Sequence, residues 1–381
     1  MIKHIKILFL LLFILTKSFL AQNVVVVIID GARYTETFGD VNRTFIPFMS
    51  ELASEGTYVD EFYNDGYTYT SRAIPALWCG AWTDLVDINY NGSNTQYTVS
   101  PTLFEYFEKQ KNPGANKNVY VLKYVSSLWL QSFHPEYGPD YWPVTYSEGS
   151  TDVDVLDKSL QIMEEDHPQF LWVYLADVDH AGHLGVWDGY TDAISTADSI
   201  VNVLWQTIQI DDFYKDNTTL LVTNDHGRHD YDFTGHGCSC DGCRHIMFLA
   251  LGPNIKQNYV STQTRYLPDF AVTAAEILDV DMEYATGHVM NEILINVNQE
   301  DLAKNDFKIN SKFIQVDLPS GCIVKVDLYD LTGRKITTLV NEKGKTGENF
   351  FNINTSNYKG LYIVQLRTEF YTTSKKVIFN L

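Results

Sequence analysis

The chain has 381 residues and a formal charge of −20 at pH 7, and this charge is unevenly distributed. Residues 22–301 carry 13 Lys and Arg against 41 Asp and Glu, a net charge of −28, whereas residues 302–381 carry 12 against 7, a net charge of +5. So acidic a surface repels polyanions, which argues against nucleic-acid binding. The length also exceeds that of one typical domain.

The N-terminus has the organisation of an export signal. Lys3 and Lys6 precede an uncharged apolar run at residues 7–14, which is too short to anchor the chain in a bilayer. We expect residues 1–21 to be a signal peptide that is cleaved after Ala21; the alternative is a buried helix. Because no later segment has about eighteen apolar residues in a row, we expect no membrane span and a secreted or cell-surface protein.

Apolar runs of strand length alternate with helical patterns over much of the chain. Five runs are continuous, as in strands buried on both faces, at residues 24–29, 119–122, 170–175, 220–223 and 246–251. Helices are expected at residues 47–55, 100–109, 153–165 and 193–209, with Ser100 as the N-cap of the second. The pattern predicts an α/β domain over residues 22–300, with a mainly parallel sheet covered by helices on both faces. In such a sheet, ligands bind at the carboxyl ends of the strands.

The remainder of the chain reads as short strands at the spacing of a β-sandwich. They are expected at residues 324–329, 336–340, 347–353, 360–367 and 373–379. The segments Val326-Asp327-Leu328-Tyr329-Asp330-Leu331-Thr332-Gly333-Arg334 and Gly360-Leu361-Tyr362-Ile363-Val364, with a Lys375-Lys376-Val377 ending, resemble the type A sorting domain of type IX secretion. The resemblance implies that residues 305–381 address the chain to the outer-membrane secretion machinery and perform no catalysis. A generic adhesive or carbohydrate-binding sandwich is the alternative.

Asp and His residues follow the predicted strands of the first domain. Asp30 follows the first strand, Asp179 and His183 follow the third, and Asp225 with His226 follows the fourth. Two such side chains four residues apart can converge on one ion, and an Asp-His pair at a strand end can bind a second. Each motif alone is weak, since an Asp at a strand end is often a helix cap, but together they predict a metal site.

This order of motifs, completed by Gly235-His236-Gly237, resembles the alkaline phosphatase superfamily, especially its nucleotide pyrophosphatase/phosphodiesterase branch. The resemblance covers about residues 23–294 and implies two zinc ions, although manganese and iron also suit the mixed nitrogen and oxygen ligands. The implied ligands are Asp179, His183 and His236 for one ion and, beside the nucleophile, Asp30, Asp225 and His226 for the other.

The nucleophile is expected in a turn that opens a helix, because a helix N-terminus binds phosphoryl oxygens. In the family that the chain resembles, it stands ten residues before the Gly that closes this helix, and counting back from Gly80 gives Thr70, which would contact the metal. Cys79 stands where Thr is common in the family and Arg72 stands where the family has Pro, which leaves Thr68 and Ser71 as rivals. The sulfatase frame Cys-x-Pro-Ser-Arg does not occur in the sequence, which counts against a sulfatase.

Asn91 lies 21 residues after Thr70, in an Asn-Gly pair. Members of the phosphodiesterase branch have an Asn at this spacing that donates a hydrogen bond to a non-bridging phosphate oxygen. Asn-Gly is also an ordinary turn signal, so Asn91 is either a catalytic residue or part of a turn.

Three cysteines, Cys238, Cys240 and Cys243, directly follow His236. In an exported chain we expect a small disulfide loop that makes the His236 segment rigid, with metal binding as the alternative. His180, His229 and His245 are candidates for a supporting role around the ligands.

The resemblance implies a secreted, metal-dependent hydrolase of small phosphate esters that works through a phosphothreonine. A phosphodiesterase or nucleotide pyrophosphatase is the expected type. The alternatives are an alkaline phosphomonoesterase, a sulfatase-like hydrolase, a mutase and a non-catalytic metal-binding surface protein. A purely structural role would need no hydroxyl at Thr70, which counts against the last of these.

Overall fold

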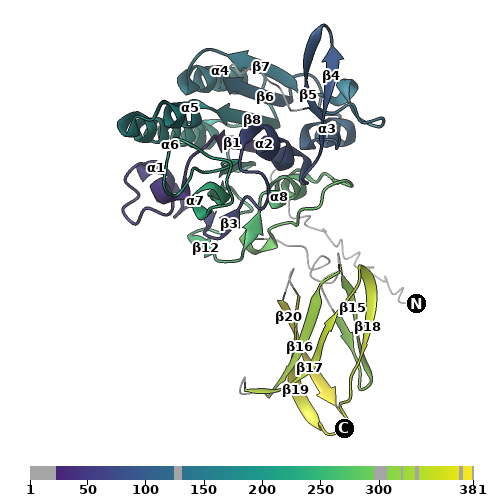
Figure 1. Ribbon diagram of the computed structural model, residues 1–381. Coiled ribbons are helices and arrows are strands. Elements are labelled where there is room, and N and C mark those ends of the chain that lie inside the picture. The colour runs from purple at the N-terminus through teal and green to yellow at the C-terminus, as the bar shows by residue number, and fades with distance from the viewer. Residues whose placement is uncertain are drawn as a thin grey trace, which may run out of the picture. The chain divides into compact units, whose positions relative to one another are not determined.

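The computed structural model describes residues 23–123, 131–295, 307–318, 321–330, 334–368 and 372–379. The chain divides into two compact units, Met1–Ile295 and Asn296–Leu381 (Figure 1). The signal peptide predicted at residues 1–21 lies outside the described residues. Within the described part of the chain, none of the helices combines the length and the apolar character that crossing a membrane requires.

The first unit is built on an eight-stranded sheet with the order β12-β2-β11-β9-β1-β8-β6-β7. Its strands are β1 (Asn23–Ile29), β2 (Thr57–Val59), β6 (Asn118–Lys123), β7 (Val144–Glu148), β8 (Phe170–Leu175), β9 (Thr218–Thr223), β11 (Phe248–Leu251) and β12 (Tyr259–Ser261). The central β1 is parallel to both β8 and β9, and β6 is parallel to β7 and β8. Among the described strands of this sheet, only β11 is antiparallel to both of its neighbours. The sheet is therefore mainly parallel, as the continuous apolar runs predict.

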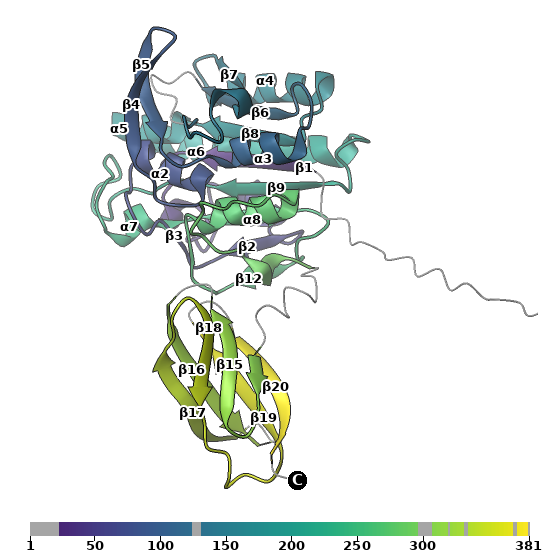
Figure 2. The same cartoon turned by 90° about the vertical axis from the view of Figure 1, so that its right-hand side faces the viewer.

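Helices cover both faces of this sheet (Figures 1 and 2). One face carries α1 (Pro47–Leu52), α4 (Asp152–Glu165) and α6 (Trp187–Ile210), and the other carries α2 (Thr70–Cys79), α3 (Leu103–Lys111) and α8 (Asp269–Leu278). In Figure 2, α3 and α8 lie in front of the strands and α6 lies behind them.

The alternation of side chains along β8 explains why both faces need a cover. Leu171 and Val173 belong to the aliphatic core shared with α4 and α6. Phe170 and Trp172 point the other way, where the ring of Trp172 lies 5.5 Å from Phe104 of α3 and 5.6 Å from Phe270 of α8, measured between centroids. Each of these side chains is fully buried, which contributes about 1.5–3 kcal/mol per large apolar side chain.

The N-cap of α3 and the strand at residues 246–251 differ from the sequence prediction. The N-cap of α3 is Thr102 and not Ser100, because Thr102 forms a capping box with Glu105, whose Oε2 accepts the Thr102 N–H at 2.7 Å. The run at residues 246–251 is also divided, into β10 (His245–Ile246) and β11. The Met247 N–H between them donates to Asn224 Oδ1 at 2.8 Å instead of to a neighbouring strand.

Several small elements have no counterpart in the sequence prediction. They include β3 (Phe62–Tyr63) and β13 (Arg265–Tyr266), which pair with β10; the hairpin of β4 (Leu85–Tyr90) and β5 (Ser93–Thr98); and the short helices α5 (Asp177–Leu184) and α7 (Asp241–Arg244). The strands β2, β7, β12, β14 (Phe307–Ile309) and β15 (Phe313–Leu318) and the helix α8 were not predicted either. β3 and β13 have two residues each and α7 has four. Elements this short are too brief to show a periodic pattern of apolar residues.

The second unit consists of two antiparallel sheets. One has the order β14-β15-β18 and the other β17-β16-β19-β20. The strands are β14 (Phe307–Ile309), β15 (Phe313–Leu318), β16 (Ile323–Tyr329), β17 (Lys335–Lys343), β18 (Gly347–Asn352), β19 (Gly360–Arg367) and β20 (Thr372–Phe379). Val324, Val326, Val364 and Leu366 belong to a buried core of this unit's own. The five predicted strands are present, whereas residues 331–333 of the sorting motif lie outside the described residues.

Candidate metal centre

Three adjacent parallel strands end at the same edge of the large sheet. Ile29 of β1 pairs with Leu175 of β8, and Ile28 pairs with Thr223 of β9. The residues that follow these strands therefore start from one level of the sheet, which is why the Asp and His motifs of the sequence come together. Asp30 follows β1 directly, Asp225 follows β9 after one residue, and α5 starts two residues after β8.

The first set of side chains consists of Asp30, Asp225, His226 and Thr70. His226 Nε2 lies 3.5 Å from Asp30 Oδ1 and 3.4 Å from Asp225 Oδ2. The hydroxyl of Thr70 lies 3.4 Å from each carboxylate oxygen of Asp30 and 3.2 Å from His226 Nε2. Ligands of a tetrahedral zinc, at about 2.0–2.1 Å from the ion, lie about 3.3–3.4 Å apart. The spacing of these atoms therefore fits a common ion.

Thr70 occupies this position because it is the first residue of α2. The helix ends at Gly80, which adopts a left-handed conformation with φ 61°, so the helix spans the interval that the sequence count assumes. Thr68, a rival nucleophile, is buried and its hydroxyl donates to the Cys238 carbonyl at 2.7 Å. Ser71, the other rival, has no hydrogen bond to Asp30 or His226 among the described residues.

The second set consists of Asp179, His183 and His236. Asp179 and His183 lie one turn apart on α5, with His183 Nε2 3.3 Å from Asp179 Oδ2. His236, from the loop after β9, brings its Nε2 to 3.5 Å from Asp179 Oδ1 and to 3.1 Å from His183 Nε2. His226 also reaches this set, since its ring stacks on that of His236 with the centroids 4.0 Å apart. All seven side chains of the predicted centre are therefore gathered in one place.

Two histidine rings are held with Nε2 directed at the carboxylates. His226 Nδ1 lies 2.9 Å from its neighbour's carbonyl, Gly227 O, and His236 Nδ1 lies 3.1 Å from Thr68 O. A ring that donates from Nδ1 to a carbonyl keeps its lone pair on Nε2, which is the form that binds a metal.

Charge and burial in the cluster favour a cation. Burial, and then the charges of Asp225 and Asp179, raise the pKa of Asp30 well above its ordinary value. Burial also raises the pKa of Asp225, and Asp225 Oδ2 is a buried oxygen without a hydrogen-bond partner. Burial, and then the charge of His226, lower the pKa of His236 to about 4, which keeps this ring neutral. Carboxylates that are costly to ionise, an unpartnered oxygen and the neutral His236 ring together fit a bound divalent metal.

Two supporting side chains were not predicted from the sequence. The buried Tyr174 on β8 donates its hydroxyl to Asp30 Oδ2. The buried Arg228 donates to the Asp179 carbonyl at 2.6 Å and to Asp179 Oδ1 at 3.0 Å. Tyr174 lies within an apolar run, and Arg228 directly follows Asp225-His226-Gly227. Neither position indicates from the sequence that the side chain contacts Asp30 or Asp179.

Close packing at Gly31 was also missed. Gly31 has φ +71°, and a Cβ added there would lie 2.8 Å from Asp179 Oδ1 and 2.9 Å from Asp179 Cβ. The absence of a side chain at this position lets β1 and α5 approach closely enough to bring Asp30 and Asp179 together.

Asn91 is not gathered with the other predicted residues. It is exposed at the tip of the hairpin of β4 and β5, and both Asn91 and Gly92 have positive φ, at 51° and 82°. This is the backbone of a two-residue type I′ turn. Among the described residues, no hydrogen bond joins Asn91 to Thr70 or to a metal ligand. The turn interpretation therefore accounts for the Asn-Gly pair.

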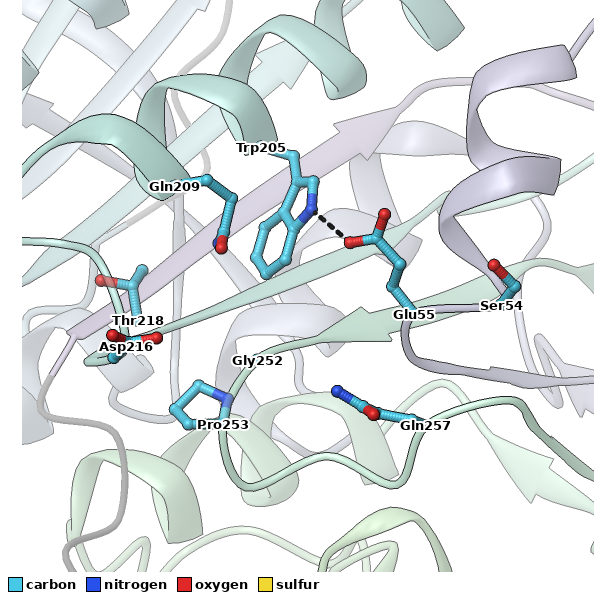
Figure 3. A pocket seen from close by; sticks show the side chains of 9 residues that line it. All are labelled: Ser54, Glu55, Trp205, Gln209, Asp216, Thr218, Gly252, Pro253 and Gln257. Atoms are coloured by element: carbon cyan, nitrogen blue, oxygen red, sulfur yellow. Dashed lines mark hydrogen bonds between the residues drawn. The ribbon is translucent and has the colours of Figure 1, made fainter.

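A separate cavity of about 290 Å³ lies away from this cluster. It is lined by Trp205, whose indole N–H donates to Glu55 at 3.1 Å, and by Thr218 and Pro253 among others (Figure 3). Thr218 is the first residue of β9, whereas Asp225 follows the last. The cavity thus lies at the opposite end of the strand and is not part of the metal centre.

Comparison with known proteins identifies two families along the chain. Residues 141–312 match the family described as Metalloenzyme superfamily, and residues 303–380 match the secretion system C-terminal sorting domain. The first match includes five of the predicted ligands, from Asp179 to His236, while Asp30 and Thr70 precede it. The second family implies use of type IX secretion machinery and indicates export to the cell surface or the medium.

Individual relatives are distant. The 2,3-bisphosphoglycerate-independent phosphoglycerate mutase of Gracilaria tenuistipitata var. liui is 24% identical over 128 residues, which are 33% of this chain and 24% of the mutase. This chain spans 22 to 31% of the length of the curated relatives that it matches.

Solved structures share the fold. Murine ectonucleotide pyrophosphatase/phosphodiesterase 5 has a TM-score of 0.53 at 14% identity, over 72% of this chain and 100% of that chain. A putative sulfatase from Bacteroides thetaiotaomicron has a TM-score of 0.57 at 12% identity, over 94% and 83%. The first unit thus contains a match to the metalloenzyme superfamily over residues 141–312 and shares its alkaline phosphatase-like fold with these structures, and a match to a secretion system sorting domain follows it in the sequence.

Proposed function

We propose that the chain is an exported two-metal hydrolase of phosphate esters in which Thr70 is the nucleophile. The observation that carries this proposal is the position of the Thr70 hydroxyl, 3.2 Å from His226 Nε2 and 3.4 Å from both Asp30 oxygens. A cluster with a purely structural role would not need a half-buried hydroxyl at the start of a helix. Zinc suits the mixed carboxylate and imidazole ligands, with Asp30, Asp225 and His226 beside the nucleophile and Asp179, His183 and His236 on the second ion.

The residues of the chain have separate tasks in the proposed reaction. Zinc bound at such ligands lowers the pKa of a coordinated hydroxyl and stabilises charge on phosphoryl and leaving oxygens. Thr70 Oγ1 attacks phosphorus in line, the bond from phosphorus to the leaving oxygen breaks, and a phosphothreonine forms. The leaving oxygen takes up the proton that Thr70 lost. Water then attacks the same phosphorus, the bond from phosphorus to Thr70 Oγ1 breaks, and a proton of the water restores the Thr70 hydroxyl as the phosphate product leaves. The N-terminus of α2, which Thr70 begins, favours the negative phosphoryl oxygens through its backbone N–H groups.

Surroundings of Thr70 favour a diester over a monoester. The nearest cation in sequence, Arg72, donates to the Thr83 carbonyl at 3.1 Å and lies over the ring of Tyr67 at 4.7 Å. Its charge is therefore engaged away from the nucleophile, where the second anionic oxygen of a monoester would need it. Tyr67 is half exposed and contacts the rings of Tyr69 and Trp82, with centroids 5.6 and 5.8 Å apart. This aromatic surface suits an aromatic leaving group or a nucleobase, as in a phosphodiesterase or nucleotide pyrophosphatase.

The nucleophile is tested by substitution. Thr70→Ala should lower the rate of ester hydrolysis by several orders of magnitude, equivalent to about 4–7 kcal/mol of transition-state stabilisation. Ser71→Ala, which removes the neighbouring hydroxyl from the same helix turn, should retain most of the activity. Full activity in Thr70→Ala would assign the nucleophile to another residue.

The type of ester is tested by comparing three substrates, p-nitrophenyl phosphate, bis-p-nitrophenyl phosphate and p-nitrophenyl sulfate. We expect the highest kcat/KM for the diester. A tenfold preference for the monophosphate would instead support a phosphomonoesterase, and a preference for the sulfate would support a sulfatase-like enzyme.

Metal content tests the ligands independently of turnover. His183→Ala should bind one zinc ion fewer than the unmodified chain, because Asp179 and His236 alone leave the second set incomplete. Equal zinc content in the two proteins, after dialysis against the same buffer, would show that His183 is not a ligand.

A further inference from the structure

Four potential metal ligands gather outside the Asp and His centre. They are His229, Cys238, Cys240 and Cys243, whose ligand atoms all lie within 4.8 Å of one another. His229 Nδ1 lies 3.0 Å from Cys238 Sγ and 3.4 Å from Cys243 Sγ. The two sulfur atoms of Cys238 and Cys243 are 3.6 Å apart. The imidazole therefore faces the thiols directly.

These distances do not fit the disulfide loop that the sequence predicts. All three cysteines have free thiols, and a disulfide would bring two sulfur atoms to about 2.0 Å. A tetrahedral zinc site, with Zn–S at about 2.3 Å and Zn–N at about 2.0–2.1 Å, separates its ligand atoms by about 3.6–3.8 Å. The separations of 3.4 Å and 3.6 Å are close to those of the zinc site, and the distance of 3.0 Å from His229 Nδ1 to Cys238 Sγ is shorter but well above a bonded distance.

We propose that His229, Cys238, Cys240 and Cys243 form a third metal site, which binds one zinc ion with a structural role. Three thiolates and one imidazole are a donor set of structural zinc sites and complete a tetrahedral shell without an open position for substrate. Cys243 is buried and the other three residues are half-buried, so the ion is enclosed by the loop that supplies its ligands.

The loop around this site is closed by contacts between its own residues. Gly242 N donates to Asp230 Oδ1 at 2.6 Å, which joins the residue after His229 to the residue before Cys243. A Cβ at Gly242 would lie 2.4 Å from the Arg228 carbonyl, so the two segments are in contact without room for a side chain. The separation of His229 from Cys243 is therefore set by the packing of the segments that carry them.

The third site connects the loops that carry ligands of the catalytic metals. Gly227 N, next to His226, donates to the Cys243 carbonyl at 2.9 Å. The Cys238 carbonyl accepts the Thr68 hydroxyl at 2.7 Å, and the Thr68 carbonyl lies 3.1 Å from His236 Nδ1. Zinc at the third site thus fixes the backbone to which the His236 ring and the start of the nucleophile loop are attached.

The test measures zinc in the full-length chain, purified with a thiol reductant and dialysed against zinc-free buffer. Cys240→Ser should contain one zinc ion fewer than the unmodified chain. Cys79→Ala, which removes a buried thiol that is not in the cluster, is the matched control and should keep the full zinc content. Unchanged zinc content in Cys240→Ser would overturn the proposal.

A second measurement does not depend on the folding of a variant. The unmodified chain reconstituted with cobalt should show thiolate-to-cobalt charge-transfer absorption, which carboxylate and imidazole ligands do not give. A spectrum without this absorption would contradict the site. The protein is also purified without reductant from zinc-containing medium, and its intact mass is compared with that of the reduced chain. A mass lower by two hydrogens would show that two of the cysteines form a disulfide, which would contradict the zinc site.

The third site and the catalytic centre fail separately. If His183→Ala loses a zinc ion and Cys240→Ser does not, the catalytic proposal stands and the third site is wrong. If only Cys240→Ser loses zinc, the reverse holds.

Discussion

Replacement of Gly31 by Ala tests how the metal centre is assembled. The new Cβ would lie 2.8 Å from Asp179 Oδ1, 2.9 Å from Asp179 Cβ and 3.1 Å from Asp179 Cα, so the backbone at the start of α5 must shift. Ala at φ +71° also costs about 1–2 kcal/mol, and overpacking typically adds about 1–3 kcal/mol. We therefore expect Gly31→Ala to lower the free energy of unfolding by about 2–5 kcal/mol and to weaken zinc binding at Asp179.

Gly92→Ala separates the two contributions. Gly92 has a similar positive φ of 82°, but a Cβ added there meets nothing within 4 Å. Gly92→Ala should therefore lower the free energy of unfolding only through its unfavourable backbone conformation, by about 1–2 kcal/mol. Both variants are unfolded in urea with a chelator present, so that metal binding does not contribute to the measured stability.

Tryptophan fluorescence reports on the first unit in this assay, because all seven tryptophans precede residue 296. Zinc affinity is measured separately by competition with a chelating dye. Equal losses of stability in Gly31→Ala and Gly92→Ala, with zinc affinity unchanged in both, would refute the close packing of Gly31 against Asp179.

Four further predictions concern single features. Burial raises the pKa of Asp198 to about 6, so between pH 4 and pH 7 the unmodified chain should lose about 2 kcal/mol of stability relative to Asp198→Asn; a pH-independent difference would contradict this. Tyr174→Phe removes the hydrogen bond to Asp30 and should weaken zinc binding by about 10–100-fold in a competition titration. Because Asn91 lies in an exposed turn, we expect Asn91→Ala to hydrolyse esters at the rate of the unmodified chain. If Asn91 is catalytic, the same variant should instead be about 10–1,000-fold slower. A chain that ends at Ile295 should hydrolyse esters in vitro but remain in the cell, and a folded, inactive product would show that the tail belongs to the catalytic unit.

Much of the fold could be predicted because its elements carry strong periodic signals. The central strands are continuous apolar runs, and β8 occupies the residues predicted for it, 170–175. The long helix α6 begins at Trp187, whereas the sequence prediction began it at residue 193. The prediction missed the first turns because they carry Asp188 and Gly189, which interrupt the apolar pattern. Elements held by side-chain contacts to distant residues gave no local signal, as the division between β10 and β11 by Asn224 shows.

The candidate site could be predicted as far as its residues follow strand ends. Parallel strands bring such residues to one edge, so Asp30, Asp179 and Asp225 converge for a reason that is visible in the sequence. Contacts across the fold were not visible. Nothing in the spacing shows that Arg228 lies against Asp179, or that Cys238 Sγ lies beside His229 Nδ1 and not within bonding distance of Cys243 Sγ.

The position of Thr70, the proposed nucleophile, depends on the loops that carry the proposed metal ligands as well as on the start of α2. Asn64 Nδ2 donates to the Tyr67 carbonyl at 2.9 Å and to the Asp225 carbonyl at 2.8 Å, which ties the segment before Thr70 to the end of β9. The Thr68 hydroxyl holds the same segment to Cys238 at 2.7 Å. These contacts are buried, so substitutions at the residues that make them should lower the rate of hydrolysis. Substitutions that change only the substrate preference should therefore lie on the solvent-exposed side of this segment. The half-exposed Tyr67 lies on that side. Its ring can stack on an aromatic leaving group, so we expect substitutions of Tyr67 to change the preference for substrates with such a group.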